Sequence, residues 1–269
     1  MAVVLVLAGL FFAPTTHAEG LVGHSVTYDV KPFKELKDAY FEGQASVTMA
    51  RDCTGWTMGE VLQIAIEHEQ GAVNRKAITD KAQRLEERVS SQEFLDGTTL
   101  KYQTRMRQDA RVETAQGTAS LGRDAGTLHA VLSRYKQDSE LPPGTLAPAA
   151  ARAALLKGLA ANQPGNIEIR TVEMLRFHKP ILQIFTPLGP EDQSVSRAKP
   201  KDLHASDKDF TKGLVWALRR NVPEFNEFGD EYWLLHESGV IVRQIIQRLG
   251  VQLLLEAHDV TLFPPPACQ

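Results

Sequence analysis

The sequence predicts a mainly β protein, built from a single curled, barrel-like antiparallel sheet that wraps one α-helix. Apolar and polar residues alternate with a period of two along most of the chain, and glycines separate these stretches at intervals typical of hairpins. One Ala-rich segment breaks the alternation. Because the alternating segments outnumber what one flat sheet tolerates, we expect the sheet to curl.

The alternating segments are the predicted strands. Each should bury one face and expose the other. In the first half of the chain they are His24–Val30, Gln44–Ala50, the more apolar Glu60–Glu67, and Thr98–Arg107. The expected turn residues between strands are Gly71, Asp96-Gly97, Gly117, Gly122 and Gly126. In the last quarter the strands are Glu231–Leu235, Val240–Leu249, Val251–Ala257 and Asp259–Phe263, with a turn at Ser238-Gly239.

The Ala-rich segment predicts a helix from Pro148 to Leu159. Proline fits the first turn, and Asn162 with Pro164-Gly165 stops the run. Its Leu155, Leu156 and Leu159 should cover the open face of the sheet or plug it. The stretch from Thr186 to Asp209 contains three prolines and many charges, and it predicts a long exposed loop.

Composition excludes several classes of protein. Apolar residues make up 43% of the 269 residues, which is a globular value and excludes a disordered chain. Lys and Arg number 30 against 33 Asp and Glu, and the net charge of −3 argues against a nucleic-acid partner. Two cysteines cannot form a four-thiolate zinc site.

The first 18 residues resemble a secretory signal peptide. An apolar run from Ala2 to Ala13 precedes Thr16-His17-Ala18, which places small residues before a cut at Glu19. No Lys or Arg precedes the run. A membrane anchor is the alternative, but about a dozen residues are too few to span a bilayer. We therefore expect one mature domain, residues 19–269, in an extracytoplasmic space, which in a bacterium is the periplasm.

The two cysteines, Cys53 and Cys268, are expected to form a bridge in that oxidising compartment. The bridge would pin the C-terminal tail to an early strand, and on the chain-entropy argument it would contribute roughly 4 to 5 kcal/mol. Two buried free thiols or one reactive cysteine are the alternatives. A thioredoxin-like role would require Cys-x-x-Cys, which the sequence lacks.

Candidate ligand or partner surfaces are few. Lys101, Arg105 and Arg107 fall on one outward strand face, which could meet an anionic lipid head group or simply face solvent. Trp56 and Trp233 could line a groove, with core packing as the alternative.

Motifs for metal, cofactor or catalytic chemistry are weak. Carboxylates flank imidazoles in Glu67-His68-Glu69 and in Glu256-Ala257-His258-Asp259, but a solvated strand end explains both. The other histidines lack the spacing of metal ligands. The sequence contains no phosphate-binding loop, dinucleotide motif or nucleophile elbow. We therefore predict no metal, no cofactor and no catalytic residue.

Five segments carry a resemblance to a known family. They are Asp52-Cys53-Thr54-Gly55-Trp56-Thr57, Phe94-Leu95-Asp96-Gly97, Leu141-Pro142-Pro143-Gly144-Thr145, Glu237-Ser238-Gly239-Val240, and Pro264-Pro265-Pro266-Ala267-Cys268. In this order they resemble the EipB family of periplasmic cell-envelope integrity proteins over most of the mature chain. The chain departs from the family at Ala147, where the family has Phe, and over Phe185–Asp209.

The resemblance implies a β-spiral wrapping a helix and a disulfide between Cys53 and Cys268. It also implies a role in maintaining the Gram-negative envelope, without enzymatic activity, and the architecture is similar to that of periplasmic carriers of lipids and lipoproteins. We expect a non-enzymatic protein that binds a periplasmic protein partner or an envelope component. Carriage of a lipid or lipoprotein acyl chain in a cavity between the sheet and the helix is the alternative. Hydrolysis is a third possibility, which no sequence motif supports.

Overall fold

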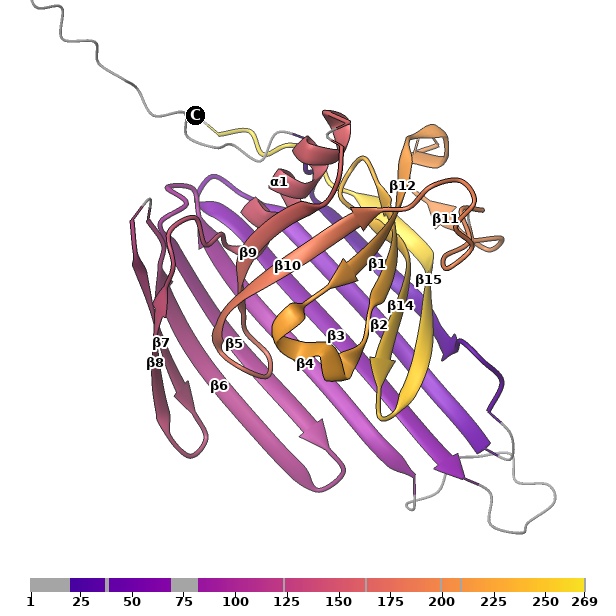
Figure 1. Ribbon diagram of the computed structural model, residues 1–269, viewed down its shortest axis with the longest axis horizontal. Helices are drawn as coiled ribbons and strands as arrows, with labels where there is room; N and C mark the ends of the chain where they lie inside the picture. Colours follow the sequence, from indigo (N-terminus) through magenta and orange to yellow (C-terminus); the bar gives the residue numbers. More distant parts are fainter. Residues whose placement is uncertain are drawn as a thin grey trace, which may run out of the picture.

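The computed structural model describes residues 20–36, 39–68, 82–122, 124–162, 164–198, 200–208 and 210–268. These residues form a 15-stranded sheet with one α-helix, α1 (Figure 1). All strand pairs are antiparallel except the short pair between β11 and β15. The prediction of a mainly β protein with one curled antiparallel sheet and one helix is confirmed.

The first eight strands form a continuous wall, each paired with the next in sequence. They are β1 (His24–Pro32), β2 (Ala39–Arg51), β3 (Gly55–His68), β4 (Gln83–Phe94), β5 (Thr99–Gln108), β6 (Arg111–Ser120), β7 (Gly126–Leu132) and β8 (Lys136–Leu141). Helix α1 (Pro148–Ala160) follows β8.

The second half of the chain extends the same sheet from its other side, because β15 pairs with β1. The strands are β9 (Ile167–Glu173), β10 (Lys179–Pro187), β11 (His204–Ala205), β12 (Val215–Asn221), β13 (Glu231–His236), β14 (Ile241–Arg248) and β15 (Val251–Leu262). Short 3₁₀ turns lie at Phe210–Lys212 and Pro223–Phe228.

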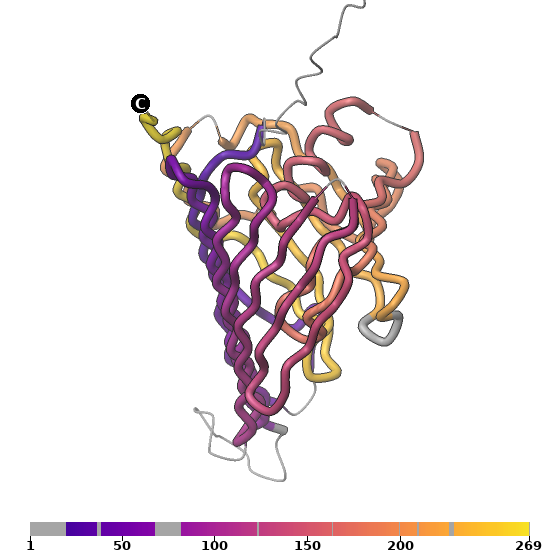
Figure 2. Tube along the Cα trace, turned by 90° about the vertical axis from the view of Figure 1, so that its left-hand side faces the viewer, coloured from indigo at the N-terminus to yellow at the C-terminus, as the bar shows by residue number. Residues whose placement is uncertain are grey.

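The sheet curls so that its later strands face its first half. Figure 2 shows a trace that tapers toward one end, with α1 lying at the wide end. In β5 the alternation sends Leu100, Tyr102 and Thr104 inward, where they are buried. Helix α1 shares one apolar cluster with Trp233 and Leu235 of β13.

The two edge strands of the sheet, β8 and β9, do not pair with each other. Residues in or next to these strands form other hydrogen bonds there. The side-chain amide of Gln137 on β8 donates to the carbonyls of Phe177 and His178, each at 3.0 Å. The Leu146 N–H donates to the Arg170 carbonyl of β9 at 2.9 Å. The bond to Arg170 occupies an edge group of β9 that would otherwise be open to pairing with another chain.

The predicted strands are confirmed, with one difference at the C-terminus. The two strands predicted for Val251–Ala257 and Asp259–Phe263 are one continuous strand, β15. Thr27 pairs with Asp259 and Tyr28 with Ala257, so His258 is an extra residue in a β-bulge. The bulge reverses the alternation, which is why the sequence pattern reads as two strands.

The expectation that Gly117 marks a turn is wrong. Gly117 lies inside β6, opposite Tyr102 of β5. A Cβ atom at this position would lie 2.2 Å from the Tyr102 ring. Glycine is therefore needed here for close approach of the ring to the backbone. The turn at Asp96-Gly97 is confirmed, and Gly71 lies outside the described residues.

The segment from Thr186 to Asp209 is not the exposed loop that the sequence predicts. Its first two residues belong to β10, and His204–Ala205 pairs with β15. Val195 is buried in one apolar cluster with Leu234 of β13. The guanidinium of Arg243 donates to the Ala198 carbonyl at 2.7 Å. The segment therefore covers the outer face of β13, and buries both faces of that strand.

The predicted helix is confirmed, and its N-terminus is capped from the sheet. Ala147 at the N-cap has no side chain that could accept a hydrogen bond. Glu93 of β4 supplies the acceptor instead, because its carboxylate accepts from the N–H groups of Ala149 and Ala150 at 2.9 and 3.2 Å. Asn162 ends the helix at a φ of 47°.

The predicted disulfide is confirmed. Cys53, in the turn between β2 and β3, is bonded to Cys268, with a Cα–Cα distance of 5.4 Å. The predicted signal peptide, residues 1–18, lies outside the described residues. Within the described ranges, no helix is both long and apolar enough to span a membrane.

Candidate functional site

The candidate site is an interior cavity of about 310 Å³ between the two walls of the curled sheet, beneath α1. One part of its lining is apolar and includes Met49, Met58, Leu155, Phe185 and Trp233. The other part is charged, and it consists of Glu60, Glu87, Glu173, Glu231, Arg152, Arg220 and Arg248. The cavity therefore offers both apolar contact and fixed charges.

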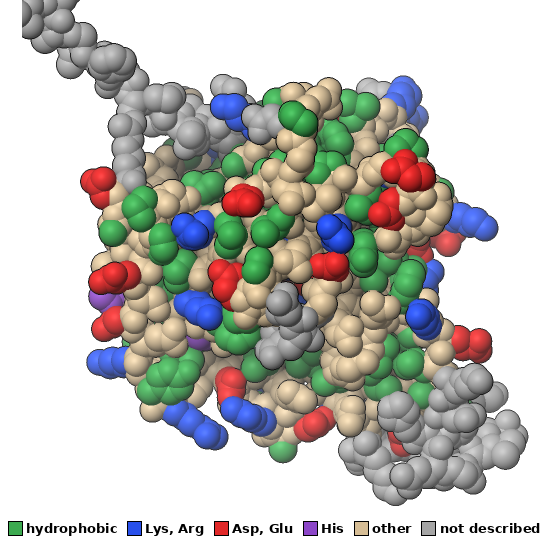
Figure 3. Space-filling model, in the orientation of Figure 1, with side chains coloured by type: hydrophobic (Ala, Val, Ile, Leu, Met, Phe, Trp, Pro, Cys, Tyr) green, Lys and Arg blue, Asp and Glu red, His purple; other side chains and the backbone are tan. Residues whose placement is uncertain are grey.

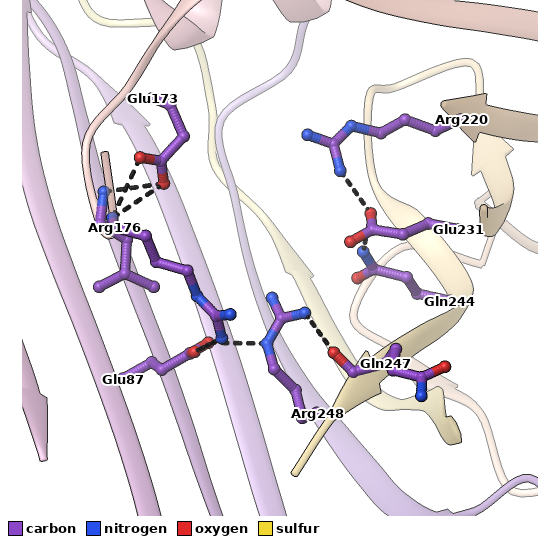
Figure 4. Close-up of polar contacts among 9 residues, drawn as sticks. Glu87, Glu173, Arg176, Arg220, Glu231, Gln244, Gln247 and Arg248 are labelled. Carbon is purple, nitrogen blue, oxygen red and sulfur yellow. Dashed lines mark hydrogen bonds and ion pairs between the residues drawn. The ribbon is translucent and has the colours of Figure 1, made fainter. Parts of the chain in front are cut away.

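Glu87 of β4 is the centre of one charged cluster. Figure 4 shows it facing Arg176, from the loop after β9, and Arg248, at the end of β14. Arg248 Nε lies 3.0 Å from its carboxylate. Burial would raise the pKa of Glu87, but Arg248 and Arg176 together hold that pKa below its ordinary value. Glu87 is therefore ionised and fully partnered.

Glu231 of β13 is the centre of the second cluster. Arg220 Nη1 of β12 donates to its carboxylate at 2.6 Å, and the Gln244 amide of β14 donates at 3.4 Å (Figure 4). Burial opposes ionisation of Glu231, but Arg220 and Arg248 lower its pKa. The Glu87 cluster joins β4 to β14 across the interior, whereas the Glu231 cluster joins the neighbouring strands β12, β13 and β14.

Glu60 of β3 is different from these carboxylates. It lines the cavity, but it accepts no hydrogen bond and forms no close ion pair with any residue that the structure describes. Burial raises its pKa, and the more distant charges of Arg152 and Arg220 only partly oppose this shift. Glu60 is thus a carboxylate whose lone pairs remain available.

Arg152 is the charged group that α1 adds to the cavity. Its Nη1 donates to the Gly239 carbonyl at 2.9 Å, and its guanidinium lies 5.1 Å from the centre of the Trp233 ring. That carbonyl bond is the one hydrogen bond of its side chain within the described chain, so the other guanidinium donors remain available.

Two further polar residues of the lining are already satisfied. His24 Nδ1 lies 2.8 Å from the Val22 carbonyl, and burial lowers its pKa to about 4, so the ring is neutral at pH 7. Tyr28 donates its hydroxyl hydrogen to the Ile241 carbonyl at 2.9 Å, and burial raises its pKa. Neither group is set up to move a proton at neutral pH.

The predicted site residues divide into two groups on opposite faces of the sheet. Leu155, Leu156 and Leu159 are all buried, and Leu155 lines the cavity, so the apolar side of the helix forms part of the cavity wall. Trp56 is 6% exposed and packs in the same apolar cluster, as does Trp233.

Lys101, Arg105 and Arg107 lie instead on the outer face of β5. Lys101 lies over the Phe94 ring, with Nζ 5.4 Å from its centre, and Arg107 Nε donates to the Asp109 carbonyl at 3.0 Å. The structure does not bring this outer group together with the leucines. On the face shown in Figure 3, cationic and anionic side chains are interspersed.

The weaker candidates lie apart from the cavity lining. His258 lies 3.6 Å from Asp259 and 3.7 Å from Asp29, at the bulge of β15. The side chain of His68, and Glu69, lie outside the described residues. In the part of the chain that the structure describes, no group of three or more His, Cys, Asp or Glu side chains could hold a metal ion.

One serine–histidine contact bears on the hydrolase reading. Ser238 Oγ lies 2.8 Å from His236 Nδ1, and the Ser238 N–H also donates to that nitrogen, at 3.1 Å. Both residues are buried, at 6% and 3% exposure, and the Phe210 ring lies 4.1 Å from the imidazole. The contact is therefore part of the packed interior and does not lie at the protein surface.

Sequence reasoning missed the charged residues of the interior. A signal exists in retrospect, because Arg152 interrupts an otherwise Ala- and Leu-rich helix and Glu60 begins the most apolar strand segment. A single charge inside an apolar run is expensive to bury and points to a special role. The sequence does not reveal that the two residues face one cavity.

Comparisons with known proteins agree with this architecture. A family model described as EipB-like matches residues 15–166. A crystal structure of a β-barrel-like protein of a domain of unknown function from Brucella abortus is similar in fold, with a TM-score of 0.72 and 12% sequence identity. The similarity covers 91% of this chain and 99% of that chain. No curated protein matches.

Proposed function

This chain belongs to the EipB-like family, and we propose that it is a non-enzymatic periplasmic protein that supports the integrity of the Gram-negative cell envelope. The proposed mature chain is the single domain of residues 19–269. It acts by binding an envelope component in its interior, or a periplasmic protein partner. The disulfide between Cys53 and Cys268 supports an oxidising compartment, which agrees with this location.

The observation that carries the proposal is the interior cavity. Its volume of about 310 Å³ lies within the range of small-molecule sites, and it combines an apolar wall with a few fixed charges. Glu87 and Glu231 are held by arginines, and His24 is neutral, so these three groups are not free to transfer protons, while Glu60 and Arg152 keep hydrogen-bonding capacity for a ligand.

Carriage of a lipid or lipoprotein acyl chain is the second candidate. It is supported by the apolar side of the cavity, where Met49, Met58 and Phe185 lie. Each methylene buried from water contributes only about 0.8 kcal/mol, so a carrier must cover many of them. Leu155 of α1 is part of the lining, so a long chain would lie against the helix, and α1 would have to move if the chain needed more room than about 310 Å³.

Native mass spectrometry of the protein, purified from the periplasm under mild conditions, tests the proposal. We expect a co-purifying envelope component that is lost in Leu156→Asp and retained in Lys157→Asp, on the exposed side of the same helix. Circular dichroism identifies a variant that has failed to fold, in which case Ala151→Phe, which fills the cavity, replaces Leu156→Asp. A clean mass for the unmodified chain, with no partner recovered, would contradict the proposal.

A further inference from the structure

Glu60 and Arg152 are opposite charges that line the same cavity without forming an ion pair. They come from different elements, β3 and α1, which lie far apart in the sequence. Each shifts the pKa of the other, so they interact electrostatically, but at more than contact distance. The other cavity pairs, Glu87 with Arg248 and Glu231 with Arg220, are in direct contact.

The Glu60 carboxylate lacks compensation from the protein. Glu60 is half-buried, and a carboxylate partly withdrawn from water without hydrogen bonds is unfavourable; the chain shows at Glu87 that it can supply guanidinium donors inside this cavity. Glu60 accepts no bond from any described residue. A ligand with N–H donors and a positive charge would satisfy this group.

Arg152 has the complementary property. Its guanidinium is fixed in place by the Gly239 carbonyl at 2.9 Å and by the Trp233 ring. Only Nη1 is used for that carbonyl, and therefore donors remain for a phosphate or carboxylate, the groups that guanidinium binds best. Lining residues Met58 and Leu155 supply apolar contact beside both charges.

We propose that the cavity binds a zwitterionic ligand, which pairs a primary ammonium group with Glu60 and a phosphate or carboxylate with Arg152. An anion alone would leave Glu60 unpaired, and an aliphatic chain alone would leave both charges unpaired. The volume of about 310 Å³ is at the lower end for ligand sites, so it suits a head group or a small free zwitterion. This inference rests on the proposed function, because it takes the cavity as the binding site.

Isothermal titration calorimetry with four soluble probes tests the inference. The probes are dihexanoyl phosphatidylethanolamine, the phosphatidylglycerol analogue without an amine, the phosphatidylcholine analogue without N–H donors, and free phosphoethanolamine. We expect the ethanolamine lipid to bind at least about tenfold more tightly than the glycerol and choline lipids, the effect of one charge-assisted hydrogen bond. Binding of free phosphoethanolamine with similar affinity would identify a small zwitterion as the source of this chemistry. Binding of the lipid alone would identify a lipid head group.

Two variants test which residue binds which charged group of the ligand. Glu60→Gln should bring the ethanolamine-to-glycerol ratio to about one and keep the fold, with thermal unfolding as the check. Arg152→Gln should weaken all phosphate probes. The controls are Glu42→Gln, exposed on β2, and Lys157→Gln, exposed on α1, which should leave the affinities unchanged.

Equal affinity for the ethanolamine and glycerol lipids, or a preference that survives Glu60→Gln, would overturn the inference. A ligand without an amine that co-purifies in the cavity would also overturn it, while leaving the proposed function standing. A protein that binds none of the probes and co-purifies with no ligand would contradict both.

Discussion

The Glu93 carboxylate on β4 accepts a hydrogen bond of 2.9 Å from the backbone N–H of Ala149 at the start of α1. The two residues are 56 positions apart, so the cap of the helix belongs to the sheet. Helix α1 forms part of the cavity wall, and this contact fixes its first turn to the sheet. The position of the first turn of α1 therefore depends on one buried carboxyl group.

Glu93 predicts a pH-dependent stability. Burial raises its pKa to about 7, from an ordinary value of 4.5, although the N–H groups of Ala149 and Ala150 oppose the shift. The folded chain thus holds an extra proton between pH 4.5 and 7. The stability contributed by this group is full below pH 4.5 and is lost as the pH rises to 7, by roughly 3 kcal/mol.

The variant Glu93→Gln does not titrate in this range and isolates the effect. The measurement is urea unfolding of both proteins at pH 4.5, 6 and 8. The free energy of unfolding of Glu93→Gln, taken relative to that of the natural chain, should rise by about 3 kcal/mol from pH 4.5 to pH 8. The comparison cancels the opposite contribution of buried His24, which is common to both. A difference that stays constant or falls with rising pH would contradict the prediction.

The disulfide predicts a structural role for both cysteines. Cys53→Ser should lower the free energy of unfolding by up to about 5 kcal/mol, because the bridge closes a loop of 215 residues. The double variant with Cys268→Ser should be equally unstable. The measurement is chemical unfolding with intact mass after alkylation. Two alkylatable thiols in the unreduced natural protein would refute the bridge.

The cluster around Glu87 predicts a large loss of stability when its carboxylate is removed. Glu87→Gln removes the carboxylate that the guanidinium groups of Arg176 and Arg248 both contact in the interior, which should cost about 3 to 5 kcal/mol. Glu113→Gln removes one partner of an exposed pair with Arg111, and should change stability by less than about 0.5 kcal/mol. Equal effects of the two substitutions on the urea midpoint would be evidence against a buried cluster.

Local sequence was sufficient to predict the elements whose own residues show a strand or helix pattern. The alternation in β1 and β5, the Ala-rich run of α1 and the cysteine pair all predicted what the structure contains. Each depends on neighbours in the chain, or on the compartment that the first residues indicate.

The errors came from contacts between distant residues. From local sequence Gly117 is a turn residue, but in the fold it makes room for the Tyr102 ring. Val195 lies in a segment that local sequence predicts to be a loop, but in the fold it packs against Leu234 of β13. A cavity between sheet and helix was expected, but its charged lining was missed for the same reason, because Glu60 and Arg152 face one cavity only after the sheet has curled. The bulge at His258 shifts the pairing register by one residue. In the sequence it shows only as a break in the apolar–polar alternation, which a strand end would also produce.

The most direct test of the central claim is complementation of a strain lacking the gene, measured as survival in detergent. The natural chain should restore resistance, and Ala151→Phe, which fills the cavity beside Arg152, should not, at equal periplasmic protein levels. Ala160→Phe, exposed at the end of the same helix, should restore resistance like the natural chain. Full restoration by Ala151→Phe, or unchanged detergent survival of the strain that lacks the gene, would contradict the account.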